Sequence, residues 1–169
     1  MSNPEANNRG KDFENLIRKK FEELNNTTIE RLPDPTMGYL GVRNKCDFLA
    51  YHFPYIYYLE CKTVHSHRLP MSNITFNQRV GMLGVANYMG VVAGVICWFI
   101  SEDKTVFMPI QCIERRRLAG DKSINIREEW DEDFIEIKGD KKRVFYDYDF
   151  ADFIITCNTK RLGHKTIKY

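Results

Sequence analysis

At 169 residues and 20.0 kDa, the chain has the length of one domain, and its hydrophobic and charged fractions of 43% and 28% are ordinary for a globular protein. A net charge of +2 is too mild to establish a nucleic-acid partner. The longest apolar run, 89–100, is too short to cross a bilayer, and residues 1–12 contain no apolar signal core. We therefore expect a single domain over residues 1–169 that is cytoplasmic and has no membrane partner.

The cysteines and histidines indicate neither a disulfide framework nor a zinc site. No C-x-x-C pair occurs, and most cysteines lie in apolar stretches, so reduced and buried thiols are expected. His65 and His67 are not followed by a second pair of ligands at zinc spacing, which favours a mobile loop. The five cysteines are Cys46, Cys61, Cys97, Cys112 and Cys157.

The first predicted element is an amphipathic helix at 11–24, in which Phe13, Ile17 and Phe21 recur at helical spacing. Residues 1–9 before it are expected to be flexible. A short strand is predicted at 27–32, and several prolines and glycines follow it. The chain from Arg31 to Lys45 is therefore expected to be a loop.

A hairpin is predicted next. Two segments rich in aromatic and branched residues, 46–51 and 55–62, flank a break at Pro54, a residue that ends strand pairing. When the two strands fold back about this break, Leu49 faces Tyr58 and Asp47 faces Glu60. The two carboxylates then lie on one face of the sheet.

This acidic pair is the most informative feature of the sequence. Opposed side chains on a hairpin lie about 5 Å apart, and like charges there destabilise the sheet, so a hard cation with oxygen ligands is a natural partner. Lys62 emerges on the same face as Glu60, where its ammonium can contact a phosphate or steady an attacking hydroxide. The alternative is that Asp47 and Glu60 are solvated residues near strand ends, paired with Lys45 and Lys62.

A second helix is predicted to begin near 73–75 and to end at Gly90. It would carry Phe76, Val80 and Leu83 on one side, with Gln78 near its first turn.

The rest of the chain completes a layered domain. The near-continuous apolar strand at 91–100 is expected to be covered on both faces, with a partner strand at 105–109. A helix with an arginine-rich exposed side is predicted at 111–118. The predicted fold class is α/β, with a mixed sheet and helices on its faces. Three further short strands are predicted, at 134–137, 144–148 and 153–156.

The order helix, Asp strand, Glu-x-Lys strand, helix resembles the core of the restriction-endonuclease-like superfamily of PD-(D/E)xK nucleases. More specifically, the chain resembles the RecU family of Holliday junction resolvases, including its smaller phage-type members, the penicillin-binding-protein-related factor A group. The similarity extends over about two-thirds of the chain, from Arg9 to Ile124. The matching residues are Gly10, Lys11, Phe13, Glu14, Asp47, Phe48, Leu59 to Lys62, Asn77, Gln78, Ala93 to Ile96 and Phe99.

The resemblance implies a role for each matching residue. Asp47 and Glu60, with the backbone carbonyl of Cys61, would ligate Mg²⁺, for which Mn²⁺ can substitute, with one or two ions in the site. Lys62 would assist the nucleophile or stabilise the transition-state charge. Glu14 would complete the acidic site, although it also suits the surface near a helix N-terminus. Gln78 would orient Lys62, water or phosphate, or it is an ordinary polar helix residue.

DNA binding is predicted from basic residues, although charge runs are often only solvated faces. The longer members of the family insert a stalk-like projection before the Asp strand, whereas this chain has only the short 31–45 loop there. Lys45 also stands where those members tend to carry a hydroxyl residue. The candidate DNA-binding residues are Arg31, Arg43, Lys45, Arg68, Arg115, Arg116 and Arg117.

The sequence thus predicts a Mg²⁺-dependent endodeoxyribonuclease, and the resemblance favours one that resolves four-way junctions by paired nicks in recombination and repair. A homodimer would match the two-fold symmetry of a junction. If the protein is phage-encoded, it would act in the cytoplasm of the bacterial host. Two alternatives stay open, a related nuclease for duplex or flap DNA and a junction-binding recombination modulator without catalysis.

Overall fold

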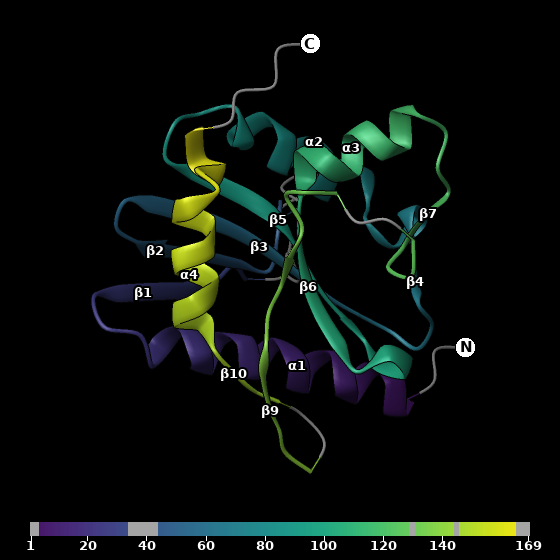
Figure 1. Cartoon of the computed structure of the whole chain (residues 1–169), viewed down its shortest axis with the longest axis horizontal. Coiled ribbons are helices and arrows are strands. Elements are labelled where there is room, and N and C mark those ends of the chain that lie inside the picture. The colour runs from purple at the N-terminus through teal and green to yellow at the C-terminus, as the bar shows by residue number, and fades with distance from the viewer. Residues whose placement is uncertain (1–3, 34–43, 129–130, 144–145, 165–169) are drawn as a thin grey trace.

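The computed structural model describes residues 4–33, 44–128, 131–143 and 146–164, which fold around a six-stranded mixed sheet (Figure 1). β3 and β5 pair in parallel, and the other neighbouring strands of this sheet are antiparallel. The predicted α/β architecture is confirmed. In spatial order the strands are β1 (Thr27–Arg31), β2 (Phe48–His52), β3 (Tyr55–Val64), β5 (Val91–Phe99), β6 (Lys104–Pro109) and β8 (Ile135–Glu136).

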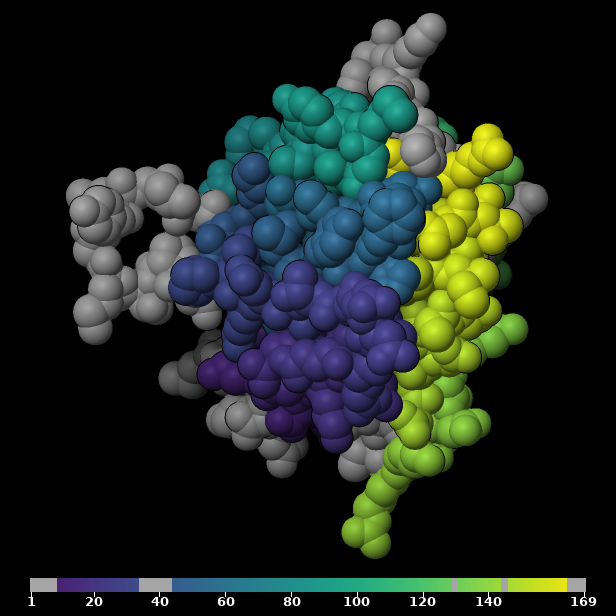
Figure 2. Space-filling model, turned by 90° about the vertical axis from the view of Figure 1, so that its left-hand side faces the viewer, coloured from purple at the N-terminus to yellow at the C-terminus, as the bar shows by residue number. Residues whose placement is uncertain are grey.

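The helices lie on both faces of the sheet. α2 and α3 lie at the top of the molecule in Figure 1 and α1 at the bottom, while Figure 2 shows α4 in yellow beside α1 in purple. Two small antiparallel ladders lie outside the main sheet, β4 (Arg68–Pro70) with β7 (Ser123–Asn125) and β9 (Gly139–Lys141) with β10 (Tyr146–Tyr148). The helices are α1 (Pro4–Glu22), α2 (Phe76–Ala86), α3 (Ile110–Leu118) and α4 (Phe150–Thr159), with short 3-10 turns at Met71–Asn73, Ile100–Glu102 and Leu162–His164.

Alternation along the central strands divides the apolar residues into two cores. Leu59 and Cys61 of β3 belong to the core that contains α1 and α4. Val64 of β3 belongs to the core that contains α2 and α3. Glu60 and Lys62 alternate with the first pair, so they face the α2 side of the sheet.

β5 confirms the expectation of a strand covered on both faces. It lies between β3 and β6, and Val95 and Ile96 are both fully buried although they belong to opposite cores. Gly94 allows the antiparallel partner β6 to approach closely. A Cβ atom at this position would lie 2.4 Å from the carbonyl oxygen of Met108.

The predicted hairpin register is also confirmed. Leu49 pairs with Tyr58 and Tyr51 pairs with Ile56, on either side of the turn that contains Pro54. β3 continues to Val64, beyond the predicted end at residue 62, because it pairs with β5 along its length.

Two element predictions are corrected by the structure. α1 begins at Pro4 rather than at residue 11, consistent with the suitability of proline for a first helical turn. The segment 153–156 is helical, because Asp149 caps α4 by accepting from the Asp152 N–H, and Phe150, Phe153, Ile154 and Cys157 bury one helical face.

The apolar side of α2 that the sequence predicts, which includes Phe76 and Val80, is largely exposed. Phe76 is 69% exposed, whereas Met82 and Ala86 make the buried contacts of this helix. The outer face of α2 is therefore not part of the core.

We predict that Gly94→Ala destabilises the protein by about 1–3 kcal/mol, because the added methyl group overlaps the β6 backbone. Denaturant unfolding measures this change. Gly10→Ala in α1 is the matched control, because a Cβ at Gly10 meets nothing within 4 Å. Equal stability of the two variants would contradict the close β5–β6 contact.

Candidate active site

Asp47 and Glu60 lie side by side, as the hairpin register predicts. The Asp47 N–H donates to the Leu59 carbonyl (3.1 Å), which continues the β2–β3 pairing by one residue. Asp47 Oδ2 also accepts from the Cys61 N–H at 2.8 Å. This side-chain bond fixes the carboxylate of Asp47 against β3, beside Glu60.

Glu60 is the central group of the site. Its side chain is buried, with the residue 1% exposed, and Oε1 accepts from Lys62 Nζ and from Gln78 Nε2, each at 2.6 Å. Oε2 is buried and has no hydrogen-bond partner within the described residues. Burial, and next the charge of Asp47, raise the pKa of Glu60 to about 7, while Lys62 opposes this shift. Within the described residues, one oxygen of this buried carboxylate is therefore open to a further partner such as a cation.

The first turn of α2 fixes the direction of the Gln78 amide. Thr75 is the N-cap: its side chain accepts from the Gln78 N–H (3.3 Å), and Gln78 Oε1 accepts from the Thr75 N–H (2.9 Å). With its oxygen bound in this capping box, Gln78 presents its amide nitrogen to Glu60. The predicted proximity of Gln78 to the acidic pair is therefore found. Thr75 was not predicted as a site residue, although the Thr-x-x-Gln spacing of a capping box is visible in the sequence.

Glu14 of α1 lies within electrostatic range of the pair, because its charge also contributes to the raised pKa of Glu60. Arg31 at the end of β1 forms an ion pair with Glu14, with 2.8 Å between Nη2 and Oε2. The structure thus brings together all three predicted carboxylates, Asp47, Glu60 and Glu14. The charge of Glu14 is offset by Arg31.

The donor set fits a hard divalent cation. Carboxylate oxygens are the ligands that Mg²⁺ prefers, and Glu60 Oε2, which lacks a partner among the described residues, would gain a contact. Burial raises the pKa of the Cys46 thiol to about 12 and that of the Cys61 thiol well above its ordinary value, so both sulfurs are protonated. Cys61 could therefore serve such an ion only through its backbone, and the ligand role of its carbonyl stays a prediction.

The arginines predicted to bind DNA are mostly engaged within the chain. Arg117 donates through two nitrogens to the buried Glu114, which also accepts from Arg79 of α2. Arg43 lies outside the described residues. The remaining carboxylate pairs are Arg68 with Glu128 (3.5 Å), Arg115 with Asp131 (2.6 Å) and Arg116 with Asp121 (3.7 Å).

A second group of possible ligands lies away from this site. One ligand atom each from Cys112, Asp131 and Asp133 lies within 4.8 Å of the others. Arg115 already donates to Asp131 (2.6 Å) and to the Cys112 sulfur (3.3 Å), and burial raises the pKa of that thiol to about 12. An internal guanidinium therefore stands where a metal ion would otherwise neutralise these groups. No local sequence pattern indicated this cluster, because Cys112 lies in α3 and the two aspartates lie further along the chain.

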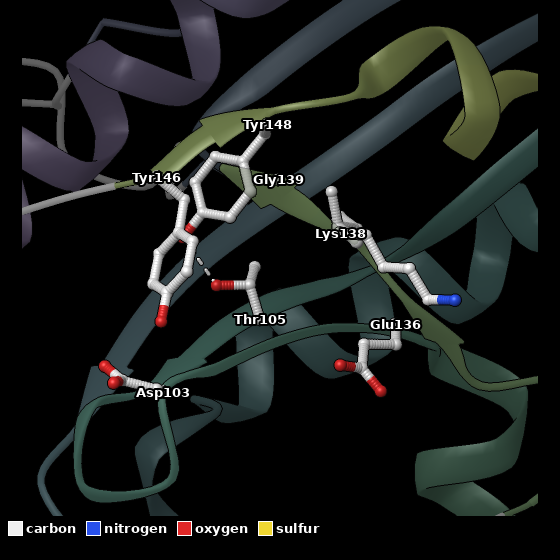
Figure 3. Close-up of a pocket in the computed structure, with 8 residues that line it drawn as sticks. Asp103, Thr105, Glu136, Lys138, Gly139, Tyr146 and Tyr148 are labelled. Atoms are coloured by element: carbon white, nitrogen blue, oxygen red, sulfur yellow. Dashed lines mark hydrogen bonds between the residues drawn. The ribbon is translucent and has the colours of Figure 1, made fainter. Parts of the chain in front are cut away.

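A hollow of about 230 Å³ lies between β6 and the β9–β10 hairpin (Figure 3). Tyr148 and Thr105 share a hydrogen bond of 2.6 Å on its wall, and Asp103 at its rim pairs with Lys141. It contains none of the acidic-site residues, so it is separate from the candidate active site.

The fold is similar to that of a solved structure. The chain is similar in structure to Hjc, a Holliday junction resolvase from the archaeal hyperthermophile Archaeoglobus fulgidus, with a TM-score of 0.50 and 18% identity over 70% of this chain and 89% of that chain. This similarity confirms the predicted restriction-endonuclease-like fold. No protein-family model and no curated protein sequence matches the chain. Among the described residues, no helix is both long and apolar enough to cross a membrane.

We predict that the metal-free protein loses stability as pH rises from about 4.5 to 7. The raised pKa means that folded Glu60 retains a proton that the unfolded chain has released in this window. Glu60→Gln removes this ionisation and should stabilise the metal-free protein at pH 8 by on the order of 1–3 kcal/mol, with a smaller gain at pH 5.

Denaturant unfolding at the two pH values measures the difference. Glu136→Gln, the same change at the separate hollow, is the control. A gain for Glu60→Gln that is equal at both pH values would contradict the raised pKa.

Proposed function

We propose that the chain is a Mg²⁺-dependent, structure-selective endodeoxyribonuclease that resolves four-way DNA junctions. The observation that supports this most strongly is the buried Glu60 carboxylate beside Asp47. One of its oxygens has no partner in the part of the chain that the structure describes, and the other accepts from the Lys62 ammonium. Metal-ligating acids next to a lysine suit hydrolysis of a phosphodiester. The junction as substrate rests on the fold shared with Hjc and on the RecU-like residue pattern.

The residues that would hold Mg²⁺, or Mn²⁺ in its place, are Asp47, Glu60 and the backbone carbonyl of Cys61, with Glu14 as a further ligand. When bound, the ion would activate water and neutralise charge on the phosphate in the transition state. The three carboxylates lie close enough to raise the pKa of Glu60, so a cation would relieve their mutual repulsion.

Lys62 would act on the reacting phosphate. Its ammonium donates to Glu60 Oε1, and its positive charge opposes the rise in the pKa of Glu60. A lysine in this position donates hydrogen bonds to a phosphate oxygen or steadies the attacking oxygen, and its flexible stem permits both. Gln78 would keep Glu60 in its rotamer, since it donates to the same oxygen and is itself held by Thr75.

The protein would act as a homodimer on branched DNA. Two active sites related by a two-fold axis match the two scissile strands of a junction, and basic residues would hold the backbones without reading the bases. Residues 31–45, of which 34–43 lie outside the described residues, are too few to form the stalk of longer RecU-type members, so the manner of junction recognition would differ from theirs. Such a protein would work in a bacterial cytoplasm, and the phage type is proposed from the resemblance.

We predict that Asp47→Asn and Glu60→Gln each reduce junction cleavage in Mg²⁺ by at least about 100-fold, because each removes a metal ligand. Binding of the junction in Ca²⁺ should be largely retained. Glu136→Gln is the matched control and should cleave like the unchanged protein.

The substrate is tested in the same assay with a four-way junction, a linear duplex and a flap. Symmetric paired nicks in the junction alone support the proposal. Cleavage of duplex or flap DNA would instead identify a related nuclease. Junction binding without any cleavage would identify a non-catalytic modulator, and full activity of Glu60→Gln would rule out the assigned site.

We predict that Lys62→Met lowers the single-turnover cleavage rate by on the order of 100-fold at saturating Mg²⁺ and DNA, because the ammonium acts on the reacting group. Lys138→Met, at the separate hollow, is the control. If only the DNA affinity fell while the saturated rate stayed unchanged, Lys62 would be a binding residue rather than a catalytic one.

A further inference from the structure

Lys45 differs from the other described residues in the predicted DNA-binding set. Each described arginine of that set pairs with a carboxylate of the same chain. Lys45 is exposed, and no carboxylate lies within ion-pair distance of it in the part of the chain that the structure describes. We infer that Lys45 binds a DNA backbone phosphate beside the acidic site and that Gly81 of α2 positions it. This inference rests on the proposed function.

The stem of Lys45 occupies the space that a side chain at Gly81 would need. A Cβ built on Gly81 would lie 2.6 Å from Cγ of Lys45, 3.0 Å from its Cβ and 3.3 Å from its Cδ. These are near atoms of the stem and not its flexible end, so the lysine would have to move as a whole. The absence of a side chain at Gly81 therefore leaves the space in which the stem of Lys45 lies.

The charged end of Lys45 is directed over the acid-bearing face of the sheet. Its Nζ lies 6.0 Å from the centre of the Tyr58 ring, within the range of a cation–π contact. Tyr58 precedes Glu60 by two residues on β3, so the two side chains share one face. The close contact with Gly81 and the ring of Tyr58 thus place a positive charge on the same face as Glu60.

A phosphate is the ligand that this charge would take. DNA approaching Asp47, Glu60 and Glu14 meets negative charge, and cations near the site are needed to offset that repulsion. Lys62 and Arg31 are already paired with Glu60 and Glu14. An ammonium offers three donors as a point charge, which suits a backbone phosphate in any sequence.

The composition of α2 offers an internal comparison. Glycine destabilises a helix interior relative to alanine, and α2 contains two, Gly81 and Gly84. A Cβ at Gly84 would meet nothing within 4 Å, whereas one at Gly81 would collide with Lys45. The same substitution at the two positions therefore separates an effect on the helix from an effect on Lys45.

The test measures junction binding in Ca²⁺ as a function of salt for Gly81→Ala, Gly84→Ala and Lys45→Met. Gly81→Ala and Lys45→Met should each lose on the order of 3–10-fold in affinity and lower the salt slope by about 0.9, the value for one phosphate contact. Gly84→Ala should bind like the unchanged protein. Thermal unfolding of each variant checks that it is folded.

A double variant shows whether Gly81 acts through Lys45. In a Lys45→Ala background most of the obstructing stem is absent, so Gly81→Ala should lower the affinity no further. An equal loss in both backgrounds, binding by Gly81→Ala equal to that by Gly84→Ala, or unchanged binding by Lys45→Met would each overturn the inference.

The outcome for the unchanged protein separates this inference from the proposed function. Binding without cleavage in Mg²⁺ would refute the nuclease and leave the role of Lys45 to be decided by the variants. Failure to bind the junction at all would refute both.

Discussion

The site depends on one unfavourable arrangement, a buried carboxylate at Glu60 next to a second carboxylate at Asp47. Burial and like charge both raise the pKa of Glu60, to about 7, and its Oε2 has no hydrogen-bond partner within the described residues. A structure retains such a group only if its surroundings hold it in place. Here the surroundings are a strand within the sheet, a lysine on the same strand and a capped helix.

The lysine and the helix act on the same oxygen of the Glu60 carboxylate. Lys62 and Gln78 both bind Oε1, while the Cys61 N–H holds the Asp47 carboxylate beside it. The capping box at Thr75 orients the amide that Gln78 presents. The result is an asymmetric carboxylate in which one oxygen is held by the protein and the other can accept a cation. The stability of the protein therefore depends on pH and on metal, because a bound cation would favour the ionised form of Glu60.

Local sequence patterns predicted the hairpin, because Pro54 marks the break between its two strands. They also predicted its register, because the position of this break determines which residues face each other. They also located β5, whose apolar run reflects its position between two strands. The segment 153–156 was wrongly predicted as a strand because Phe153 and Ile154 form a short apolar run, which fits a strand or a buried helix equally well. The capping aspartate Asp149 was the signal that distinguishes them.

Long-range pairing could not be predicted. The arginines of α3 appeared as a basic surface, yet Arg115 pairs with Asp131, and Glu114 of the same helix binds Arg79 of α2. Both contacts depend on how α3 packs, whereas the Arg117–Glu114 pair is local to the helix. Likewise, nothing local connects Gly81 with Lys45, since the contact forms only when α2 lies over the sheet. The roles assigned to these residues in DNA binding stay predictions.

The most direct test of the account is anomalous diffraction from crystals of the protein soaked in Mn²⁺. The account predicts a manganese peak between the Asp47 and Glu60 carboxylates, in contact with Glu60 Oε2. A peak only at Cys112, Asp131 and Asp133, or an unoccupied site between Asp47 and Glu60 at saturating Mn²⁺, would contradict it.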